Sequence, residues 1–482
     1  MKEKNWHAQP FTMVLVVTVV LLVASQFDTR IKIFGFEAKK VEPLSEIQIK
    51  EQSEIAPLPE LFVNDSSKTK DSARIAVNPS IKNSTAIIDY KTDTSSALSY
   101  FFQALNGTKK QMRKTRIAYF GDSMIEGDLI SQDLRSCMQD KFGGYGVGFV
   151  PITSIVAGFR GSVIHSFDGW TTYNLLKKPP PNHVLGISGY GFVTTIMNKN
   201  DSANALSDCW VKYITVNKKH INKFYETKLL YGKNDSANYV VINGTRYLLK
   251  GENTVNQLDI KTKNGSQSIN ANFQCKSPLD VFGFSMESDS GVFVDNFSFR
   301  GNSGLPIAKV SQGVYSGTND CLGYDLIILE YGLNAVNPKV TDFSWYEQGM
   351  NNVIKHIQAS FPKTSILLIS VGDKSYRNEG IYETDPSVPI LVQTQKRMAK
   401  NNKIAFWSLY DAMGGNGSMV KWVEGDTALA LIDYTHFNFR GAHKAGKLLY
   451  NKLMNEYDEY NKKCTSSVLP YTDKIIKDQN IK

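Results

Sequence analysis

The strongest constraint on the fold is an alternation of short apolar runs with segments whose apolar residues recur at helical spacing. The run RIAYFG, which starts at Arg116 and ends in glycine, is followed by such a segment up to Phe142. Downstream, the pattern predicts strands at 325–330, 365–371 and 404–409 and helices at 345–361, 390–400 and 442–460. Apolar strands that alternate with helices form a parallel sheet covered on both faces. The sequence therefore predicts an α/β protein.

The stretch 150–295, between these two halves, has a different character. It contains short runs rich in aromatic and β-branched residues, such as CWVKYITV and LDVFGFSM. Asn243 and Gly244 separate two such runs, and both residue types tolerate the positive φ of a type I′ turn, which predicts a β-hairpin. We therefore expect a β-sandwich domain inserted into an α/β domain that is split into 93–149 and 296–465.

The N-terminus carries a membrane or export signal. Lys2 and Lys4 precede an apolar run from Phe11 to Ala24, and a lysine-flanked run at this position is more typical of a signal than of buried strands. We favour an uncleaved anchor in 1–37 with its N-terminus inside, and leave cleavage after the run open. This predicts a membrane partner and a location on the periplasmic side of the cell envelope.

Two further segments complete the expected organisation. Residues 38–92 mix Glu, Lys, Ser, Asn and Pro without a sustained apolar period, which is typical of a tether. A short helix is expected just before the first core strand, at Tyr100 to Leu105, and a tail is expected at 466–482. The tether would hold the α/β domain away from the membrane.

Charge and cysteine content exclude several classes of partner. The formal net charge is +9, but the basic residues are scattered among acidic ones, which argues against a nucleic-acid partner. The five cysteines show no CxxC pair and no metal-ligand spacing with histidine, so we expect no metal and no cofactor. Cys209 and Cys275 are the pair to test for a disulfide, although small core residues are the more common role.

The sharpest local motif is Gly121-Asp122-Ser123, directly after a predicted strand and at the start of a predicted helix. A serine at this turn lies at the carboxyl edge of a parallel sheet, where ligands bind in such folds. Gly121 permits the tight turn, Asp122 can cap the helix, and the first free N–H groups of the helix can stabilise an oxyanion. A plain helix cap explains the tripeptide equally well, so its meaning depends on partners elsewhere in the chain.

Asp433 and His436 are the first of these partners. They lie in LIDYTHFNFRG, between the last predicted strand and the last helix, so their loop also reaches the carboxyl edge of the sheet. At a separation of three residues the carboxylate can accept from one imidazole nitrogen while the other nitrogen faces Ser123. Serine needs such a base to act as a nucleophile. His443, one helical turn along, is a competing base that spacing alone does not exclude.

Asn334 and Gly301 are candidate stabilisers of an oxyanion. Asn334 follows the predicted strand DLIILE, and its amide can donate a hydrogen bond without titrating. Gly301 lies in FRGNSG, where the β-rich stretch ends, and its backbone can approach a reacting carbonyl closely. A turn role for the asparagine and a loop role for the glycine are the alternatives.

The order Ser, Gly, Asn, Asp-x-x-His resembles the SGNH/GDSL hydrolase family over 116–142 and 296–462. The resemblance implies a flavodoxin-like three-layer domain in which Ser123 is the nucleophile, His436 the base and Asp433 the residue that orients it. It also implies an oxyanion hole formed by the backbone of Ser123 and Gly301 with the side chain of Asn334. The chain departs from the family pattern in GDSM for GDSL and in Ala335, where an acidic residue is usual.

The large β-rich insertion makes the chain resemble bacterial peptidoglycan O-acetylesterases, in which a carbohydrate-binding-module-like domain interrupts the hydrolase domain. This resemblance implies a serine esterase that removes O-acetyl groups from an envelope glycan. Asp122, Trp170 and Tyr190 are expected substrate-binding residues, although aromatic residues in a β-sandwich more often pack in its core. An O-acetyltransferase with the same triad and a non-catalytic glycan-binding protein are the alternatives.

Overall fold

The computed structural model describes residues 32–33, 36–37, 85–91, 96–177, 179–196 and 206–479, without the side chains of 32–33, 36–37, 235 and 465–479. The predicted membrane segment, Phe11 to Ala24, lies outside these ranges, and within them no helix is long and apolar enough to cross a membrane. The chain divides into two compact units, 1–76 and 77–482. In the described part of the first unit, β1 (Lys32–Ile33) pairs with β2 (Phe36–Glu37). All other elements that the structure describes lie in the second unit.

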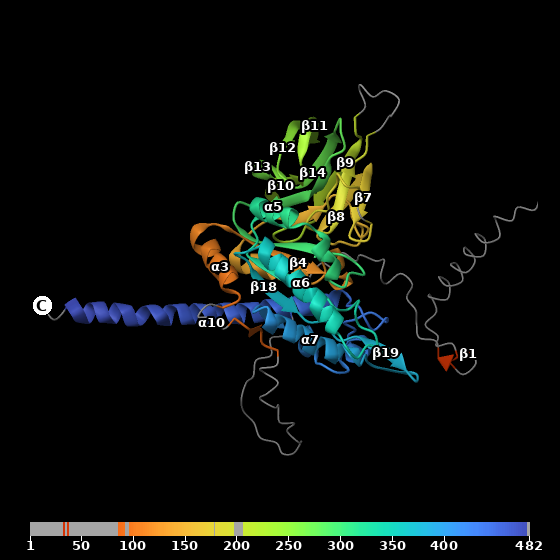
Figure 1. Ribbon diagram of the computed structural model, residues 1–482, viewed down its shortest axis with the longest axis vertical. Helices are drawn as coiled ribbons and strands as arrows, with labels where there is room; N and C mark the ends of the chain where they lie inside the picture. Colours follow the sequence, from red (N-terminus) through yellow and green to blue (C-terminus); the bar gives the residue numbers. More distant parts are fainter. Residues whose placement is uncertain are drawn as a thin grey trace, which may run out of the picture. The chain divides into compact units, whose positions relative to one another are not determined.

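A six-stranded sheet forms the centre of the second unit (Figure 1). In spatial order its strands are β16 (Gly291–Ser298), β4 (Lys114–Gly121), β17 (Leu326–Glu330), β18 (Ser365–Ile369), β21 (Ala405–Trp407) and β3 (Ile88–Asp89). Neighbours pair in parallel, except that β3 is antiparallel to β21. When the five parallel strands are numbered along the chain, their order is 2-1-3-4-5, as in flavodoxin-like folds. The predicted α/β class is confirmed.

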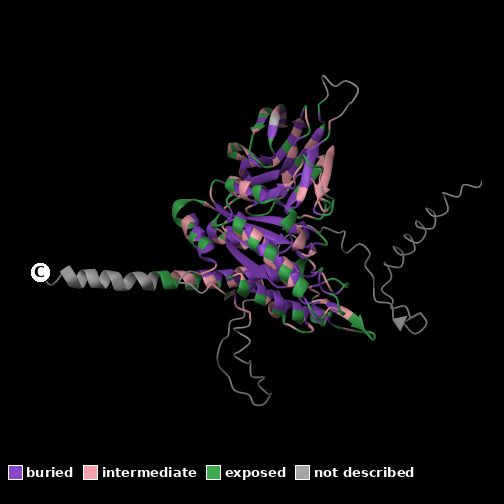
Figure 2. Ribbon diagram, in the orientation of Figure 1, coloured by how far each residue is buried: buried purple, intermediate pink, exposed green. Residues whose placement is uncertain are grey.

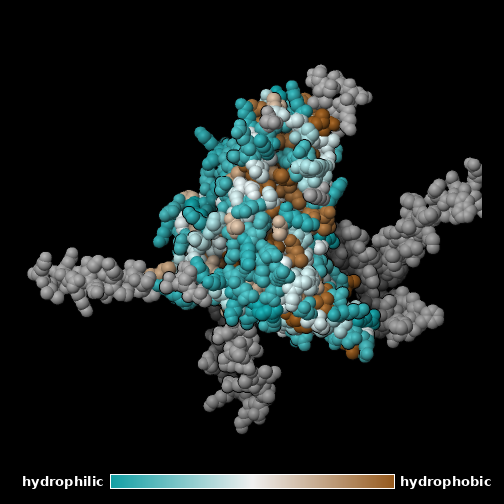
Figure 3. All heavy atoms as spheres, viewed as in Figure 1, coloured by the Kyte–Doolittle hydropathy of each residue, from teal (hydrophilic) through white to brown (hydrophobic). Residues whose placement is uncertain are grey.

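Helices cover both faces of this sheet. Every residue of β17 and β18 is buried, as strands in the middle layer of a three-layer fold must be (Figure 2). One group of helices that pack together comprises α3 (Ser99–Gln111), α4 (Ser131–Phe142) and α10 (Phe439–Gln479). The other comprises α5 (Gln312–Leu322), α6 (Ser344–Ser360) and α7 (Ser387–Asn401). Figure 3 shows mostly hydrophilic side chains on the face where α6 and α7 lie, which is consistent with solvent contact.

The segment after Ser123 differs from the single helix that apolar spacing predicts. It begins with a 3-10 segment, η1 (Ser123–Asp128), and α4 starts only at Ser131. Gly127, Asp128 and Ile130 all have positive φ, which breaks the helical path between the two. Asp122 caps η1 as predicted, since its carboxylate accepts from the Met124 N–H at 3.0 Å.

Residues 148–287 form two antiparallel sheets, seen in yellow and green in Figure 1. One contains β5 (Gly148–Pro151), β7 (Trp170–Asn174), β8 (Tyr190–Thr194), β10 (Phe224–Tyr231), β13 (Asn256–Ser266) and β15 (Asp280–Glu287). The other contains β6 (Val163–Asp168), β9 (Cys209–Thr215), β11 (Asn234–Ile242), β12 (Thr245–Gly251) and β14 (Ser268–Gln274). A single apolar cluster joins them, with Val211 and Phe273 from the second sheet and Leu229 and Phe284 from the first.

Two local predictions in this region have clear outcomes. Asn243 and Gly244 connect β11 to β12 with φ of 49° and 86°, so the predicted hairpin is confirmed. Cys209 and Cys275 are both fully buried in the apolar cluster, but no disulfide joins them. The Cys209 thiol instead donates to the Gly169 carbonyl at 2.9 Å.

Three boundaries differ from those that the sequence predicts. The run GVFVDNFS, whose composition resembles that of the β-rich stretch, is β16 and pairs in parallel with β4. The end of the expected tether carries β3, and Ile87 beside it is buried because it packs on the core of the parallel sheet. Finally, α10 continues through most of the expected tail, to Gln479. All three differences arise from strand pairing or from the continuation of a helix, which amino-acid composition does not predict.

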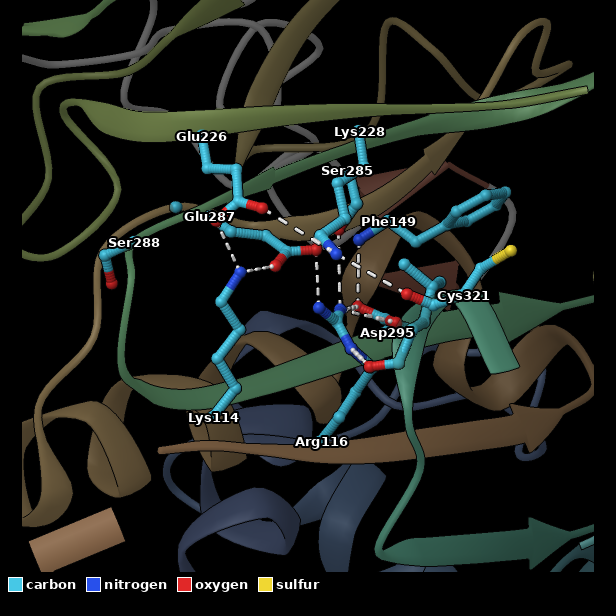
Figure 4. A network of polar contacts seen from close by, with 12 residues as sticks. Lys114, Arg116, Phe149, Glu226, Lys228, Ser285, Glu287, Ser288, Asp295 and Cys321 are labelled. Atoms are coloured by element: carbon cyan, nitrogen blue, oxygen red, sulfur yellow. Dashed lines mark hydrogen bonds and ion pairs between the residues drawn. The ribbon is translucent and has the colours of Figure 1, made fainter. Parts of the chain in front are cut away.

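A buried ionic network joins the antiparallel part to the parallel sheet (Figure 4). Arg116 on β4 pairs with Glu287 on β15 and with Asp295 on β16, and all three side chains are fully buried. Lys114, two residues earlier on β4, pairs with Glu287 and with Glu226 on β10, at 2.6 and 2.7 Å. Because Glu226 and Glu287 lie on a different sheet from Lys114 and Arg116, these ion pairs fix β4 against β10 and β15.

Candidate active site

The candidate residues gather at one edge of the parallel sheet because of its register. Gly121 on β4 pairs with Ser298 on β16 on one side and with Glu330 on β17 on the other. The segments that follow these three residues therefore leave the sheet side by side, and they carry Ser123, Gly301 and Asn334. This edge is the carboxyl edge, where ligands bind in open α/β sheets.

Ser123, His436 and Asp433 form a continuous hydrogen-bonded chain. The Ser123 Oγ lies 2.8 Å from His436 Nε2, and His436 Nδ1 lies 2.7 Å from Asp433 Oδ2. When Nδ1 carries the proton and donates to the carboxylate, Nε2 has its lone pair directed at the serine hydroxyl. The arrangement is that of a nucleophile, a general base and an orienting acid.

The Asp433 carboxylate is held in its ionised form. Partial burial by itself raises the pKa of Asp433, but hydrogen bonds from the backbone and side chain of His436 and from the backbone of Thr435 more than offset this, so the pKa lies below its ordinary value. Its Oδ1 accepts from both backbone N–H groups at 3.0 Å. The charge that orients the imidazole is therefore present at neutral pH.

The loop that carries His436 is braced on both sides. The Leu431 N–H donates to the His436 carbonyl at 2.8 Å, which closes the loop on itself. Tyr434 stacks on Tyr382 with 3.6 Å between ring centroids, and its hydroxyl donates to Glu424 at 2.7 Å. These contacts hold the imidazole in place, as a base that must meet a fixed nucleophile requires.

His443, the competing base, forms its side-chain hydrogen bond with a different residue. Its Nδ1 contacts Asp133 on α4 at 2.6 Å, and its side chain is half exposed. Of the two histidines, His436 is the one that contacts Ser123.

Asn334 and Gly301 follow the two strands, β17 and β16, that pair with β4 on either side. The Asn334 amide donates to the Asn302 carbonyl at 3.0 Å and to Asp122 Oδ2 at 3.3 Å, so it is anchored beside the residue that precedes Ser123. Gly301 has a φ of 74°, and a Cβ at this position would meet open space. The left-handed backbone conformation, and not crowding, is therefore the reason for a glycine here.

Two residues close to the Gly121-Asp122-Ser123 motif carry buried carboxyl groups: Asp122 itself, and Glu330, which pairs with Gly121 in the sheet. Burial raises the pKa of Asp122 to about 7, although the Met124 N–H, His436 and Asn334 act in the opposite direction. Burial also raises the pKa of Glu330 to about 8, and the Tyr119 hydroxyl donates to this side chain. Asp122 and Glu330 line a small cavity other than the one that Ser123 lines. Asp122 thus lines a different cavity from Ser123, and Met124 lines both.

An open cavity of about 260 Å³ is lined by Ser123 and His436. The sequence did not reveal several of its residues: Met124, Glu126, Leu129, Phe159, Arg300, Leu431 and Phe437. Arg300 and Glu126 form an ion pair at its wall, and Phe159 packs against Phe439 at 5.3 Å between ring centroids. Arg300 directly precedes Gly301, and Glu126 follows Ser123 by three residues. Their closeness in sequence to these motifs is the signal that could have identified them. Phe159 comes from the β-rich stretch, and no motif marks it.

The two aromatic residues expected to bind substrate have different environments. Trp170 donates from Nε1 to the Trp210 carbonyl at 2.9 Å and packs edge-on against Phe273, and it lines neither this cavity nor its neighbour. Tyr190 stacks on Phe299 with 4.8 Å between ring centroids and lines a second, small cavity of about 50 Å³. The second cavity adjoins the first because Glu126 lines both.

A solved structure described as a peptidoglycan O-acetylesterase in action superimposes on this chain with a TM-score of 0.63 at 21% identity, covering 77% of this chain and 99% of that one. The chain has the fold of a peptidoglycan O-acetylesterase. The resemblance to SGNH/GDSL hydrolases that the motifs indicate is thus confirmed at the level of the fold.

Other comparisons are more distant or negative. A protein from Bacillus subtilis matches with a TM-score of 0.30 at 13% identity, covering 61% of this chain and 90% of that one. A family two carbohydrate esterase from Cellvibrio japonicus matches with a TM-score of 0.25 at 9% identity, covering 61% and 99%. No family model and no curated protein matches the sequence.

Proposed function

We propose that the protein is a serine esterase that removes O-acetyl groups from a glycan of the cell envelope, with peptidoglycan as the first candidate. The observation that carries the proposal is the chain of contacts from Ser123 through His436 to Asp433 at the wall of an open cavity. A cap or a structural histidine needs neither the 2.8 Å contact between Oγ and Nε2 nor an ionised carboxylate behind it. Acyl transfer needs both.

The first half of the reaction transfers the acetyl group to the enzyme. His436 Nε2 takes the proton of Ser123 as Oγ forms a bond to the ester carbon, and the carbonyl electron pair moves onto oxygen. When this intermediate collapses, the bond to the sugar oxygen breaks, and that oxygen takes the proton from His436. Asp433 stabilises the imidazolium that exists between the two transfers.

Water then attacks the acetyl-serine with the same base, and acetate leaves as Ser123 recovers its proton. The developing oxyanion in both halves is assigned to the N–H groups of Ser123 and Gly301 and to the Asn334 amide. The longer of the two Asn334 hydrogen bonds, 3.3 Å to Asp122, is the contact that an oxyanion would replace.

The glycan substrate is supported by the architecture. The superimposed structure is described as a peptidoglycan O-acetylesterase, and the similarity extends over 77% of this chain, so it reaches beyond the parallel sheet. We assign a carbohydrate-binding-module-like role to the antiparallel sheets of 148–287. We assign an export or anchoring role to the apolar run Phe11 to Ala24, which would place the enzyme on the periplasmic side of the envelope.

The direct test is acetate release by the full chain from 4-nitrophenyl acetate and from O-acetylated peptidoglycan. Ser123→Ala should lower kcat by about 10³-fold or more. Ser316→Ala is the matched control, since Ser316 lies on α5 and donates to the Ser360 carbonyl away from the cavity, and it should keep the wild-type rate. Equal rates in the wild type and Ser123→Ala would overturn the proposal.

The same machinery supports acetyl transfer when a sugar hydroxyl replaces water. Adding a saccharide acceptor to the assay separates the two activities. Acetylated saccharide as the main product, with little free acetate, would make the protein an O-acetyltransferase, whereas acetate release that is insensitive to the acceptor makes it an esterase. A protein that binds glycan but shows neither activity would be the non-catalytic alternative.

A further inference from the structure

The cavity at Ser123 is lined from the histidine side of the triad. Ser123, Asp433 and His436 line it. Asn334 and Gly301, to which the oxyanion is assigned, do not. In the proposed reaction His436 gives its proton to the leaving oxygen, so the alcohol part of the ester must lie next to this imidazole. The cavity is therefore the place for the sugar unit and not for the acetyl group.

Much of the remaining wall of this cavity is apolar. Met124, Leu129 and Phe437 line it as buried residues. Phe159 and Leu431 also line it, and they are 45% and 41% exposed. Exposed apolar residues that occur singly are ordinary, but a group of them around a cavity indicates a binding site. At about 260 Å³ the cavity has the size of a small ligand pocket, which suits a single ring.

Phe159 is the lining residue best placed to contact such a ring. Of the two phenylalanines that line the cavity, Phe437 is buried and packs against Trp422 with 4.9 Å between ring centroids. Phe159 alone of the two presents an exposed ring. It lies between β5 and β6, and it is the one residue of 148–287 that lines this cavity. The antiparallel part of the molecule therefore contributes to the wall of the reaction cavity through Phe159.

The Phe159 ring is held by contacts with the parallel part. It packs against Phe439, the first residue of α10, with 5.3 Å between ring centroids and 32° between the ring planes. Gly127 lies close to its edge, since a Cβ there would come within 2.3 Å of Phe159 Cδ1. The next residue, Arg160, pairs with the buried Asp128 at 3.5 Å. A ring fixed before the ligand arrives loses little conformational entropy when the ligand packs on it.

We propose that Phe159 is a specificity-determining residue whose ring stacks on the apolar face of the sugar that carries the acetyl group. This inference rests on the proposed function, which supplies the ester and the leaving oxygen. The flat apolar face of a phenyl ring matches the C–H face of a pyranose. The ion pair of Glu126 and Arg300 on the same wall offers hydrogen-bond acceptors and donors to the sugar hydroxyls. The antiparallel part thus selects the substrate inside the active site itself.

Binding of a β-1,4-linked N-acetylglucosamine tetramer to the full chain carrying Ser123→Ala tests the stacking contact without catalysis. Calorimetry should show binding that Phe159→Ala and Phe159→Leu each weaken about tenfold or more, as the loss of an aromatic anchor does. Phe159→Trp keeps a flat ring and should bind within about threefold of the parent. Ile155→Ala is the matched control, because Ile155 lies in the same segment and is exposed but does not line the Ser123 cavity.

The outcomes separate this inference from the proposed function. No binding of the tetramer, or equal binding by Phe159→Ala and Ile155→Ala, would overturn the stacking role even if Ser123-dependent acetate release is found. Full binding by Phe159→Leu would overturn it too, because an aliphatic side chain would then suffice. Conversely, binding that is lost in Phe159→Ala and Phe159→Leu and kept in Phe159→Trp would support the role even if acetate release does not depend on Ser123.

In an active enzyme, the same contact predicts a difference between two substrates. Phe159→Ala should lower kcat/KM for O-acetylated peptidoglycan about tenfold more than kcat/KM for ethyl acetate, whose alcohol part has no ring face to stack. Equal losses with both substrates would show that Phe159 acts on the triad and not on the sugar, which would also overturn the inference.

Discussion

Ser123 Oγ and His436 Nε2 lie 2.8 Å apart although 313 residues separate them in the chain. The register of the parallel sheet places the serine, and a braced loop before α10 brings the histidine to it. A contact of this length between a hydroxyl and an imidazole is one in which a proton can pass when the oxygen attacks.

His436→Ala should therefore lower kcat by about 10²- to 10⁴-fold with 4-nitrophenyl acetate, because the serine loses its general base. His443→Ala is the matched control: it removes a histidine that also contacts an aspartate, Asp133, but does not contact Ser123. It should stay within about twofold of the wild type. A loss confined to His443→Ala would mean that the base has been assigned to the wrong residue.

Asn334→Ala should lower kcat by about 10²- to 10³-fold with little change in KM, as the loss of an oxyanion donor does. Asn337→Ala is the matched control in the same loop. The side-chain oxygen of Asn337 accepts a hydrogen bond from the Lys339 N–H and takes no part in the site. Steady-state kinetics distinguish the two. If KM rises while kcat is preserved in Asn334→Ala, the residue binds ground-state substrate instead.

The free energy of unfolding should fall as pH rises from about 5 to 8. Burial raises the pKa of Glu330 to about 8, so in this window the folded protein retains a proton that the unfolded chain releases. A group protonated only in the folded state contributes a slope of about −1.4 kcal/mol per pH unit at most. Glu330→Gln, which mimics the protonated acid, should flatten the dependence.

Denaturant unfolding at several pH values measures this slope. Asp122, whose pKa burial raises to about 7, keeps part of the slope in Glu330→Gln. Glu347→Gln, which alters a pair with Arg397 at 2.7 Å on the outer side of α6, should keep the wild-type slope. An unchanged slope in Glu330→Gln would show that this carboxyl group is ionised in the folded protein.

Arg116→Met should destabilise the protein by about 3–5 kcal/mol, because Glu287 and Asp295 would remain buried without their shared guanidinium partner. Arg113→Met, three residues earlier, removes a pair with Asp325 whose arginine side chain is 45% exposed, and should cost about 0–1 kcal/mol. Denaturant unfolding of the full chain compares them. Similar small losses in both variants would mean that the network in Figure 4 contributes little to stability.

Several elements of the fold follow from the sequence because their signals are local. The apolar run at Leu326–Glu330 and the helical spacing over Ser344–Ser360 each correspond to an observed element within a residue or two. Asn243 and Gly244 predict their hairpin because positive φ is a property of those residue types. Residue chemistry alone determines such features.

Other features depended on the tertiary structure. The helix expected directly after Ser123 is interrupted at Gly127 and Ile130, and β16, whose composition is that of the antiparallel stretch, pairs with β4. Gly127 permits the break locally, but the positive φ of Ile130 and the choice of β4 as the partner of β16 depend on the packing of distant segments.

For the candidate site, the sequence by itself determined the residue types and their order: a serine after a strand, then glycine, asparagine and an aspartate–histidine pair. Only the tertiary structure decided between His436 and His443, and only it showed Glu126, Arg300 and the second cavity. The physical reason is that motifs record what a short segment can do, whereas distances between segments arise from sheet register and from loops that close over hundreds of residues.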